Sequence, residues 1–380
     1  MEHIAIDLGG RESQICIRAS DGSIVEEDRR ATASLGKYLA KRPPARVVLE
    51  SCAEAFAIAE AARKTGHEVT VVPASLVRAL GVGSRGLKND VRDARNLSEA
   101  SCRMARLPAV HIPRAENREL KAVCGMREAL VQVRTKLVNT ARSWLRTSGI
   151  PPMRRGAPET LTARYRKHVQ EKAGNAIPAH VERILAAIES MNQQVEAADV
   201  ELEKLAAQHD VCKLLMTTPG VGPVTAARFV AVVDDVSRFP NAHAVESYLG
   251  LTPGEDSSSE RKRTTGITKA GQTRMRWALV QAAWAARRCR QKDPMLQWAV
   301  AVEERRGRRV AITALARKIA GILYAIWRDH RAYSARSAAG VADGGAPTTI
   351  VREPTAPPAC APLAGAPLGR LRNTRPAVHE

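Results

Sequence analysis

Residues 181–205 repeat apolar side chains at alternating steps of three and four residues, and this pattern restricts the fold more than any other in the chain. Such steps form the heptad pattern of a helix that packs one narrow edge against a partner helix. The pattern predicts a coiled coil, and an amphipathic helix packed on its own domain is the alternative. The side chains of this row are Val181, Ile184, Ile188, Met191, Val195, Ala198, Leu202 and Leu205.

The first 73 residues show the periodicity of strands rather than of one long helix. Asp7 and Glu50 each end a short apolar run. Three strands joined by Gly9-Gly10 and Asp21-Gly22 turns, followed by alternating helices and strands, predict a mixed sheet with helices against it. The expected strands are 3–7, 13–18, 23–29, 45–50 and 68–73, and the expected helices are 34–41, 53–65 and 75–81.

The rest of the chain reads as helical. Residues 114–148 predict one long helix, with Arg127, Arg134, Arg142 and Arg146 on one face, and 149–158 break it. The apolar row expected on that helix is Val123, Met126, Leu130, Val133, Leu137 and Trp144.

A third, helical unit is expected over residues 212–330. In it, 217–233 predict two helices joined by a tight turn. The amides of Gly220 and Gly222 and the following helix start are suited to hold a phosphate. From residue 334 on, an Ala/Pro/Gly-rich composition predicts a disordered tail.

The charge points to nucleic acid. Lys and Arg number 59 against 39 Asp and Glu, a formal charge of +20. Residues 115–172 carry 13 basic and 5 acidic side chains, and 260–309 carry 14 and 4. Seven scattered cysteines without a C-x-x-C pair argue against a zinc site or disulfides and for a cytoplasmic protein. We expect no signal peptide and no membrane span.

Asp90 and Asp93 stand three residues apart at the start of an expected helix, so both carboxylates share one face. The alternative is ordinary helix-start chemistry, in which Asp complements the helix dipole. If the strands that end in Asp7 and Glu50 are neighbours, four carboxylates can meet at one edge of the sheet. Four carboxylates can bind two divalent cations about 4 Å apart and polarise a phosphodiester, and Mg²⁺ prefers such oxygen ligands.

Residues 249–271 contain three serines followed by the basic run Arg261, Lys262 and Arg263. The alternative here is a flexible, polar loop. A functional serine would attack a phosphodiester, with the basic side chains neutralising phosphate charge. His243 is the histidine nearest in sequence, so the hydroxyl would need a metal ion or carboxylates from elsewhere for activation.

Taken together, the four acids, "PGVGPVTA", "YLGLTPGEDSSSERKRTTGITKAG" and "MRWALVQAAW" resemble the DEDD transposases of one large group of insertion sequences. These transposases are described as bridge-RNA-guided DNA recombinases. The resemblance covers roughly residues 1–330. It implies an α/β plus α architecture: an RNase H-like (RuvC-like) domain over 1–148, a linker and coiled coil over 149–210, and a helical transposase domain over 211–333, followed by the tail.

The resemblance also implies chemistry. Asp7, Glu50, Asp90 and Asp93 match the metal-binding acids, for two Mg²⁺ ions that Mn²⁺ can replace. Ser257 matches the serine that becomes linked to DNA, with Ser258 in reserve. Ser259 and Asp256 depart from the family's motif. Family members join the acids and the serine in one centre between subunits, and a structured RNA encoded by the element pairs with target and donor DNA.

The expected partners are therefore double-stranded donor and target DNA, a structured guide RNA and further copies of the chain, as a dimer or tetramer. The residues expected to contact nucleic acid are Lys88, Arg127, Arg134, Arg142, Arg146, Gly220, Gly222, Arg261, Lys262, Arg263 and Lys269.

Three other interpretations compete. "IAIDLGG" resembles the first phosphate loop of sugar-kinase-like phosphotransferases, but residues 150–330 lack the second such turn. A Holliday-junction-type endonuclease would use the acids and water, without a covalent step. A non-catalytic scaffold would account for the charge but not for four carboxylates in a basic protein.

Overall fold

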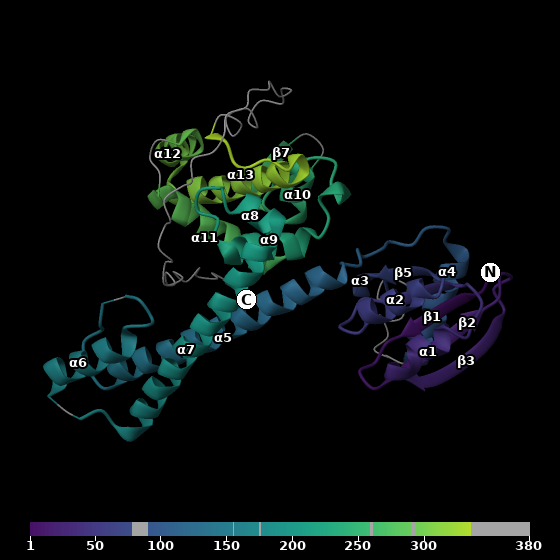
Figure 1. The fold of residues 1–380 in the computed structure, drawn as a ribbon, viewed down its shortest axis with the longest axis horizontal. Coiled ribbons are helices and arrows are strands. Elements are labelled where there is room, and N and C mark those ends of the chain that lie inside the picture. The colour runs from purple at the N-terminus through teal and green to yellow at the C-terminus, as the bar shows by residue number, and fades with distance from the viewer. Residues whose placement is uncertain (78–89, 155, 175, 259–260, 290–292, 336–380) are drawn as a thin grey trace, which may run out of the picture. The chain divides into compact units, whose positions relative to one another are not determined.

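The computed structural model describes residues 1–77, 90–154, 156–174, 176–258, 261–289 and 293–335, without the side chains of Val77, 255–265 and Cys289. The chain forms two compact units, residues 1–114 and 115–380 (Figure 1). Lys88 and almost all of the expected tail lie outside the described residues.

The first unit is built on a five-stranded mixed sheet of order β3-β2-β1-β4-β5. β1 pairs antiparallel with β2 and parallel with β4, and β5 continues the parallel part. The predicted mixed sheet is confirmed, and it is consistent with an RNase H-like fold. The strands are β1 His3–Asp7, β2 Glu12–Arg18, β3 Ile24–Ala31, β4 Arg46–Glu50 and β5 Glu68–Val72.

Helices cover both faces of this sheet. One face carries α1 (Leu35–Leu39) and α2 (Ala55–Lys64), and its core contains Ile4, Ile6, Val47 and Leu49. The other face carries α4 (Asp90–Arg103), and Ala5, Val48 and Leu97 share a buried cluster there. The central strands are apolar on both faces because both are covered. The short elements η1 (Thr32–Ser34) and α3 (Ala74–Val77) complete the unit.

The second unit begins with a long antiparallel helix pair, α5 (Ala115–Thr147) and α7 (Ala179–Gln208), connected through α6 (Leu161–Ala173). Leu145, near the end of α5, shares a cluster with Leu185 near the start of α7. Leu120, near the start of α5, shares another with Leu202 near the end of α7. The two helices therefore pack against each other along their length, in opposite directions, within one chain (Figure 1).

This pairing gives the heptad row a partner in its own chain. Val181, Ile188, Val195 and Leu202 are buried, and the helix that carries them packs on α5. The prediction of a long helix is confirmed, and the buried part of the row packs within its own chain. Periodicity alone does not tell whether the partner helix belongs to the same chain or to another.

The long helix α5 differs from expectation in two ways. Its expected apolar row contains Met126 and Val133, which are 70% and 48% exposed. The face that is buried instead includes Leu120, Cys124 and Val138. In addition, α5 packs with the second unit, whereas the expected domain boundary attached it to the first.

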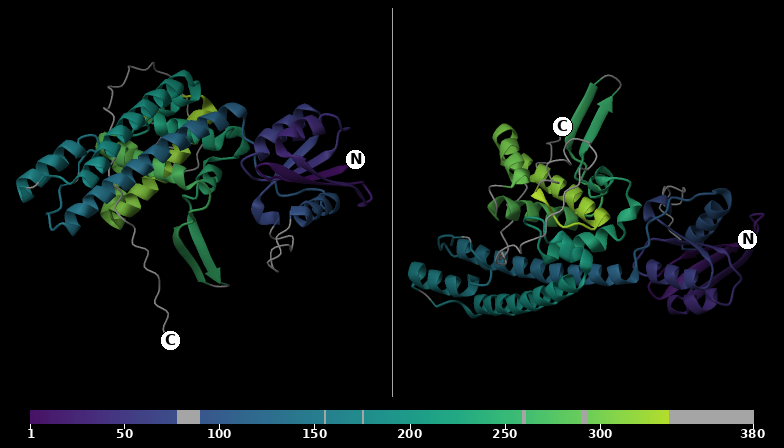
Figure 2. Two further views of the ribbon diagram at one scale, coloured as in Figure 1. Left: turned by 90° about the horizontal axis from the view of Figure 1, so that it is seen from below. Right: turned by 45° about the horizontal axis from the view of Figure 1, so that its top comes forward.

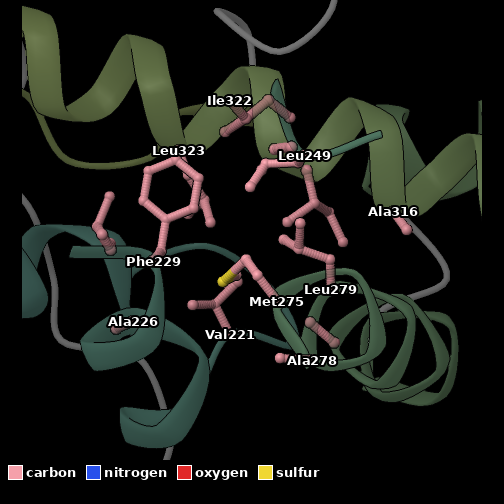
Figure 3. Close-up of a cluster of buried hydrophobic side chains, with 14 of the residues drawn as sticks. Val221, Ala226, Phe229, Leu249, Met275, Ala278, Leu279, Ala316, Ile322 and Leu323 are labelled. Atoms are coloured by element: carbon pink, nitrogen blue, oxygen red, sulfur yellow. The ribbon is translucent and has the colours of Figure 1, made fainter. Parts of the chain in front are cut away.

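Helix α9 (Pro223–Val233) runs through the core of the second unit, and its residues are almost all buried. Figure 3 shows part of this core, where Phe229 of α9, Met275 of α11 and Leu323 of α13 point toward one another. The other elements of the unit are α8 (Asp210–Leu215), η4 (Val236–Arg238), α10 (Ala242–Tyr248), β6 (Pro253–Ser258), β7 (Arg261–Ile267), α11 (Thr273–Cys289), α12 (Pro294–Arg306) and α13 (Arg308–Asp329).

Helix α13 is long and apolar enough, by length and composition, to cross a membrane. Most of its apolar stretch is buried inside the unit, with Leu315, Ile319 and Leu323 fully covered. We therefore interpret it as the core helix of the second unit.

The intrachain pairing predicts a difference between Ile188→Ala and Met126→Ala. Ile188 is fully buried, so its truncation should destabilise the second unit by about 2–5 kcal/mol. Met126 is mostly exposed, and its truncation should change stability by no more than about 0.5 kcal/mol. All five tryptophans lie in this unit, so tryptophan fluorescence during urea unfolding reports on it alone. Equal effects of the two substitutions would contradict the pairing.

Candidate acidic site and serine hairpin

Asp7 and Glu50 are neighbours at the carboxyl ends of two parallel strands. In the pairing of β1 with β4, Ile6 lies opposite Leu49, and the two acids are the next residue on each strand. Adjacent strands are about 4.8 Å apart, so the two backbones carry their acids side by side. The expectation that these strands are adjacent is confirmed.

Both acids lie on the sheet face that α4 covers. On β1, the His3 ring is 2.8 Å from Ser101 Oγ of α4, and Ala5 packs with Leu97. Asp7 lies on the same face as His3 and Ala5, because residues two apart in a strand share a face.

The same reasoning applies to β4. Arg46 donates hydrogen bonds of 3.0 Å to the carbonyls of Ser101 and Met104, and Val48 belongs to the cluster of Leu97. Glu50 is the next residue of β4 on that face.

Helix α4 runs so that its start lies over these acids. Its end is held at the beginning of the strands by the contacts of Ser101 with His3 and Arg46. From Ser101 back to Asp93 is about 12 Å of helix, and from His3 forward to Asp7 is about 13 Å of strand. The first turn of α4 is therefore level with Asp7 and Glu50.

Asp90 and Asp93 both stand in that first turn. Asp93 is only 7% exposed, whereas Asp90 is exposed. Within the described part of the chain, no three acidic, histidine or cysteine side chains come close enough to form a metal-binding group. The backbone thus brings acids from three elements to one end of one face, without closing their side chains around a common point.

The chemistry of this set suits a hard divalent cation, because carboxylate oxygens are the ligands that Mg²⁺ prefers. It also suits a phosphodiester substrate only with such a cation, since carboxylates alone repel phosphate. The assignment of the four acids as metal ligands stays a prediction.

The candidate serines lie on a β-hairpin. From the sequence, this segment was expected to be a polar loop within a helical unit. β6 and β7 form a two-stranded antiparallel sheet that projects from the helices of its unit in both views of Figure 2. In its register Ser257 is opposite Lys262 and Ser258 is opposite Arg261. Each candidate serine therefore has a basic residue as its cross-strand neighbour. Residues 257 and 258 belong to opposite faces of the strand.

Comparison with known proteins places these features in one family. A family model described as "Transposase IS116/IS110/IS902 family" matches residues 212–297, and a DEDD transposase model of the IS110 type matches 4–149. A putative transposase of Sinorhizobium fredii, y4qE, is 30% identical over 86% of this chain and 86% of its own length. The transposase for insertion sequence element IS1328 of Yersinia enterocolitica is 28% identical over 87% of this chain and 98% of its own. The chain belongs to the DEDD transposase family of insertion sequences.

A probable family 20 transposase of Pseudomonas aeruginosa shows the same relation, at 27% identity over 88% of this chain and 98% of its own. Membership makes the chain a DNA strand-transfer enzyme in general, and implies use of a divalent metal ion. The match over residues 4–149 includes all four acids, and the match over residues 212–297 includes both candidate serines.

In this transposase the glycine turn between α8 and α9 serves packing. Gly220 has a φ of +82°, and a Cβ there would lie 2.3 Å from the Ala282 carbonyl oxygen and 2.5 Å from the Ala286 nitrogen of α11. Around Gly222, in contrast, a Cβ would meet nothing within 4 Å. Gly220 is therefore needed for the close approach of the turn to α11. The sequence had instead suggested that the amides of this turn hold a phosphate.

Two of the arginines expected to contact nucleic acid are engaged inside the unit. Arg134 is 6% exposed and donates to Glu159 and Asn192, each at 3.2 Å. Arg127 forms an ion pair with Asp199 of α7. These contacts fasten α5 to its neighbours and count against both residues as phosphate contacts. Arg142 is half-buried, Arg146 and Lys269 are exposed, and the side chains of residues 261–263 lie outside the description.

A basic corner, absent from the residues expected to contact nucleic acid, lies where α12 meets α13. Glu303 accepts from Arg287 at 2.7 Å and from Arg308 at 2.9 Å. The other exposed arginines of the corner are Arg305, Arg306 and Arg309. The excess of basic residues over 260–309 was the signal for it, but only the turn between the two helices brings these side chains together.

The packing of the glycine turn predicts different results for two substitutions. Gly220→Ala should destabilise the second unit by at least about 2 kcal/mol, because the new Cβ overlaps backbone that cannot move independently. Gly222→Ala should cost less than about 1 kcal/mol. The midpoint of urea unfolding by tryptophan fluorescence measures both. If both variants kept wild-type stability and both lost DNA affinity, the phosphate-binding interpretation would be the correct one.

Proposed function

We propose that this transposase cuts and rejoins DNA through a covalent phosphoserine intermediate, with Asp7, Glu50, Asp90 and Asp93 as ligands of Mg²⁺. Ser257 is the nucleophile, with Ser258 as the second choice. The observation that carries the proposal is the placement of Asp7 and Glu50 side by side on the face covered by the start of α4.

The proposed step conserves the number of phosphoester bonds. The serine hydroxyl gives up its proton, its oxygen bonds to phosphorus, and the bond from phosphorus to a deoxyribose oxygen breaks. The leaving hydroxyl takes a proton, and rejoining reverses the step, so no ATP is needed. A bound divalent cation would neutralise charge on the phosphate and favour the ionised hydroxyl. In the hairpin register a basic residue, Lys262, stands opposite Ser257, which supports the choice of this serine.

DNA is the substrate that the family implies, and we propose donor and target duplexes together with a structured guide RNA. The formal charge of +20 and the exposed arginines of the α12–α13 corner support binding to phosphates. A homo-oligomer, dimer or tetramer, belongs to the proposal: the acids and the serine stand in different units of the chain, and the family resemblance implies a centre assembled between subunits.

One prediction of this proposal concerns the acids. Asp7→Asn, Glu50→Gln and Asp93→Asn should each lower strand cleavage at least about 100-fold, because each removes a charged metal ligand. DNA affinity and the unfolding midpoint should stay close to wild type. Mn²⁺ binding, followed by electron paramagnetic resonance, should weaken in the same variants and so gives a readout apart from activity.

Glu68→Gln is the matched control, because Glu68 begins β5 at the opposite end of the sheet and its side chain is 61% exposed. It should cleave DNA and bind Mn²⁺ as the wild type does. Full cleavage by any one of the three acid variants would remove that residue from the site.

The second prediction tests the serine. DNA trapped with wild-type protein should carry a peptide from residues 256–261, with the phosphoester on Ser257. The Ser257→Ala/Ser258→Ala double variant should form no adduct and should not cleave. Mixing Asp7→Ala with Ser257→Ala should restore part of the activity if the centre is assembled between subunits.

An adduct on Ser258 would correct the choice of residue. Full cleavage by the double serine variant without any adduct would instead establish a metal-dependent nuclease that uses water, of the Holliday-junction type. If the hairpin takes no part in the reaction, cleavage should depend on the acids and not on the serines.

A further inference from the structure

Arg276 stands at the base of the serine hairpin, on the first turn of α11. The residue before it, Met275, is fully buried in the core of the unit, part of which Figure 3 shows. Arg276 itself is 8% exposed. No ion pair with a carboxylate holds it among the described side chains. Its contacts are with backbone oxygens instead.

These contacts join the two ends of the hairpin. Nη1 of Arg276 lies 3.2 Å from the carbonyl oxygen of Leu249, which precedes β6. The same nitrogen donates to the carbonyl of Ala270 and lies 3.4 Å from that of Gly271, both of which follow β7. Nη2 donates to Thr273 Oγ1 at 3.0 Å. One rigid guanidinium thus links the chain before the hairpin to the chain after it.

The neck of the hairpin, formed by residues 248–252 and 268–271, is closely packed. A Cβ on Gly250 would lie 2.2 Å from the Ala270 oxygen, and one on Gly271 would lie 2.1 Å from the Tyr248 oxygen. Both glycines have a positive φ, of +68° and +66°. Two backbone hydrogen bonds close the neck, from Thr268 N to Thr252 O at 2.9 Å and from Lys269 N to Gly250 O at 3.2 Å.

We propose that Arg276 is a positioning residue, which fixes the angle at which the hairpin leaves the helical unit and so places the nucleophilic serine. This inference rests on the proposed function. From Pro253 to Ser257 the strand extends about 13 Å, so a tilt of about 10° at the neck moves residue 257 by about 2 Å. A misplacement of about 1 Å at reacting atoms can cost about 100-fold in rate.

Lysine cannot replace arginine here, because an ammonium is a single point on a flexible stem and lacks the planar fork. The test compares Arg276→Lys with Arg274→Lys, a matched control two residues away on the same helix with a half-exposed side chain. Two rates are measured well below the unfolding temperature: hydrogen exchange of the Thr268 and Lys269 amides, and formation of the DNA adduct.

We expect Arg276→Lys to exchange these two amides at least about tenfold faster and to form the adduct about 10–100-fold more slowly. DNA affinity and the unfolding transition by tryptophan fluorescence should match those of Arg274→Lys, which behaves as wild type. A residue needed only for folding would lower the transition and the affinity together. Thr273→Val, which removes only the Nη2 acceptor, should shift both rates in the same direction by less, and it serves if Arg276→Lys does not fold.

Unchanged exchange in both variants would overturn the link at the neck. Faster exchange with an unchanged rate of adduct formation would overturn the positioning role. If the wild-type protein itself forms no adduct, the proposed function fails, while hydrogen exchange still decides whether Arg276 holds the hairpin.

Discussion

The acidic site depends on how α4 is seated across β1 and β4. Arg46 donates to the carbonyls of Ser101, Met104 and Ala105 at the end of that helix, and the His3 ring meets Ser101 beside them. These contacts lie at the end of the sheet opposite the acids, yet they fix where the helix begins. A shift by one turn would move Asp93 by about 5.4 Å along the strands, and the carboxylates would no longer stand level with one another.

The same contacts explain why this end of α4 is polar. Ser98 and Ser101 are fully buried, and each has a hydrogen-bond partner on the sheet, Arg18 in the first case and His3 in the second. Buried polar groups that are paired in this way specify one register, because any other would leave donors and acceptors unsatisfied. Apolar packing of Leu97 against Ala5 and Val48 would by itself permit more than one register of α4 on the sheet.

The second unit relies on close backbone approach at its turns. Gly220 lets the α8–α9 turn contact α11. Gly250 and Gly271 let the chain before the hairpin and the chain after it lie in close contact. The sequence predicted that the amides of Gly220 and Gly222 hold a phosphate. The structure shows the chain's own backbone against Gly220, Gly250 and Gly271, so these glycines act on function through the placement of the elements they join.

Local patterns in the sequence were sufficient for the elements themselves. Short apolar runs and the turns between them identified all five strands of the sheet within two residues, and Asp7 and Glu50 were recognised at strand ends because those runs stop there. The heptad row identified α7, since the period of a helix is written in the sequence. The candidate serines and acids were found from residue types and their order.

Only the tertiary structure decided which surfaces meet. Arg134 carries the same signal as Arg146 in the sequence, but its position opposite Glu159 and Asn192 buries it. The partner of the heptad row, the β-hairpin in a helical unit, and the role of Gly220 likewise depend on residues tens of positions away. A pattern within one segment records the period and the apolar face of that segment, whereas the identity of the surface it covers is a property of the whole chain.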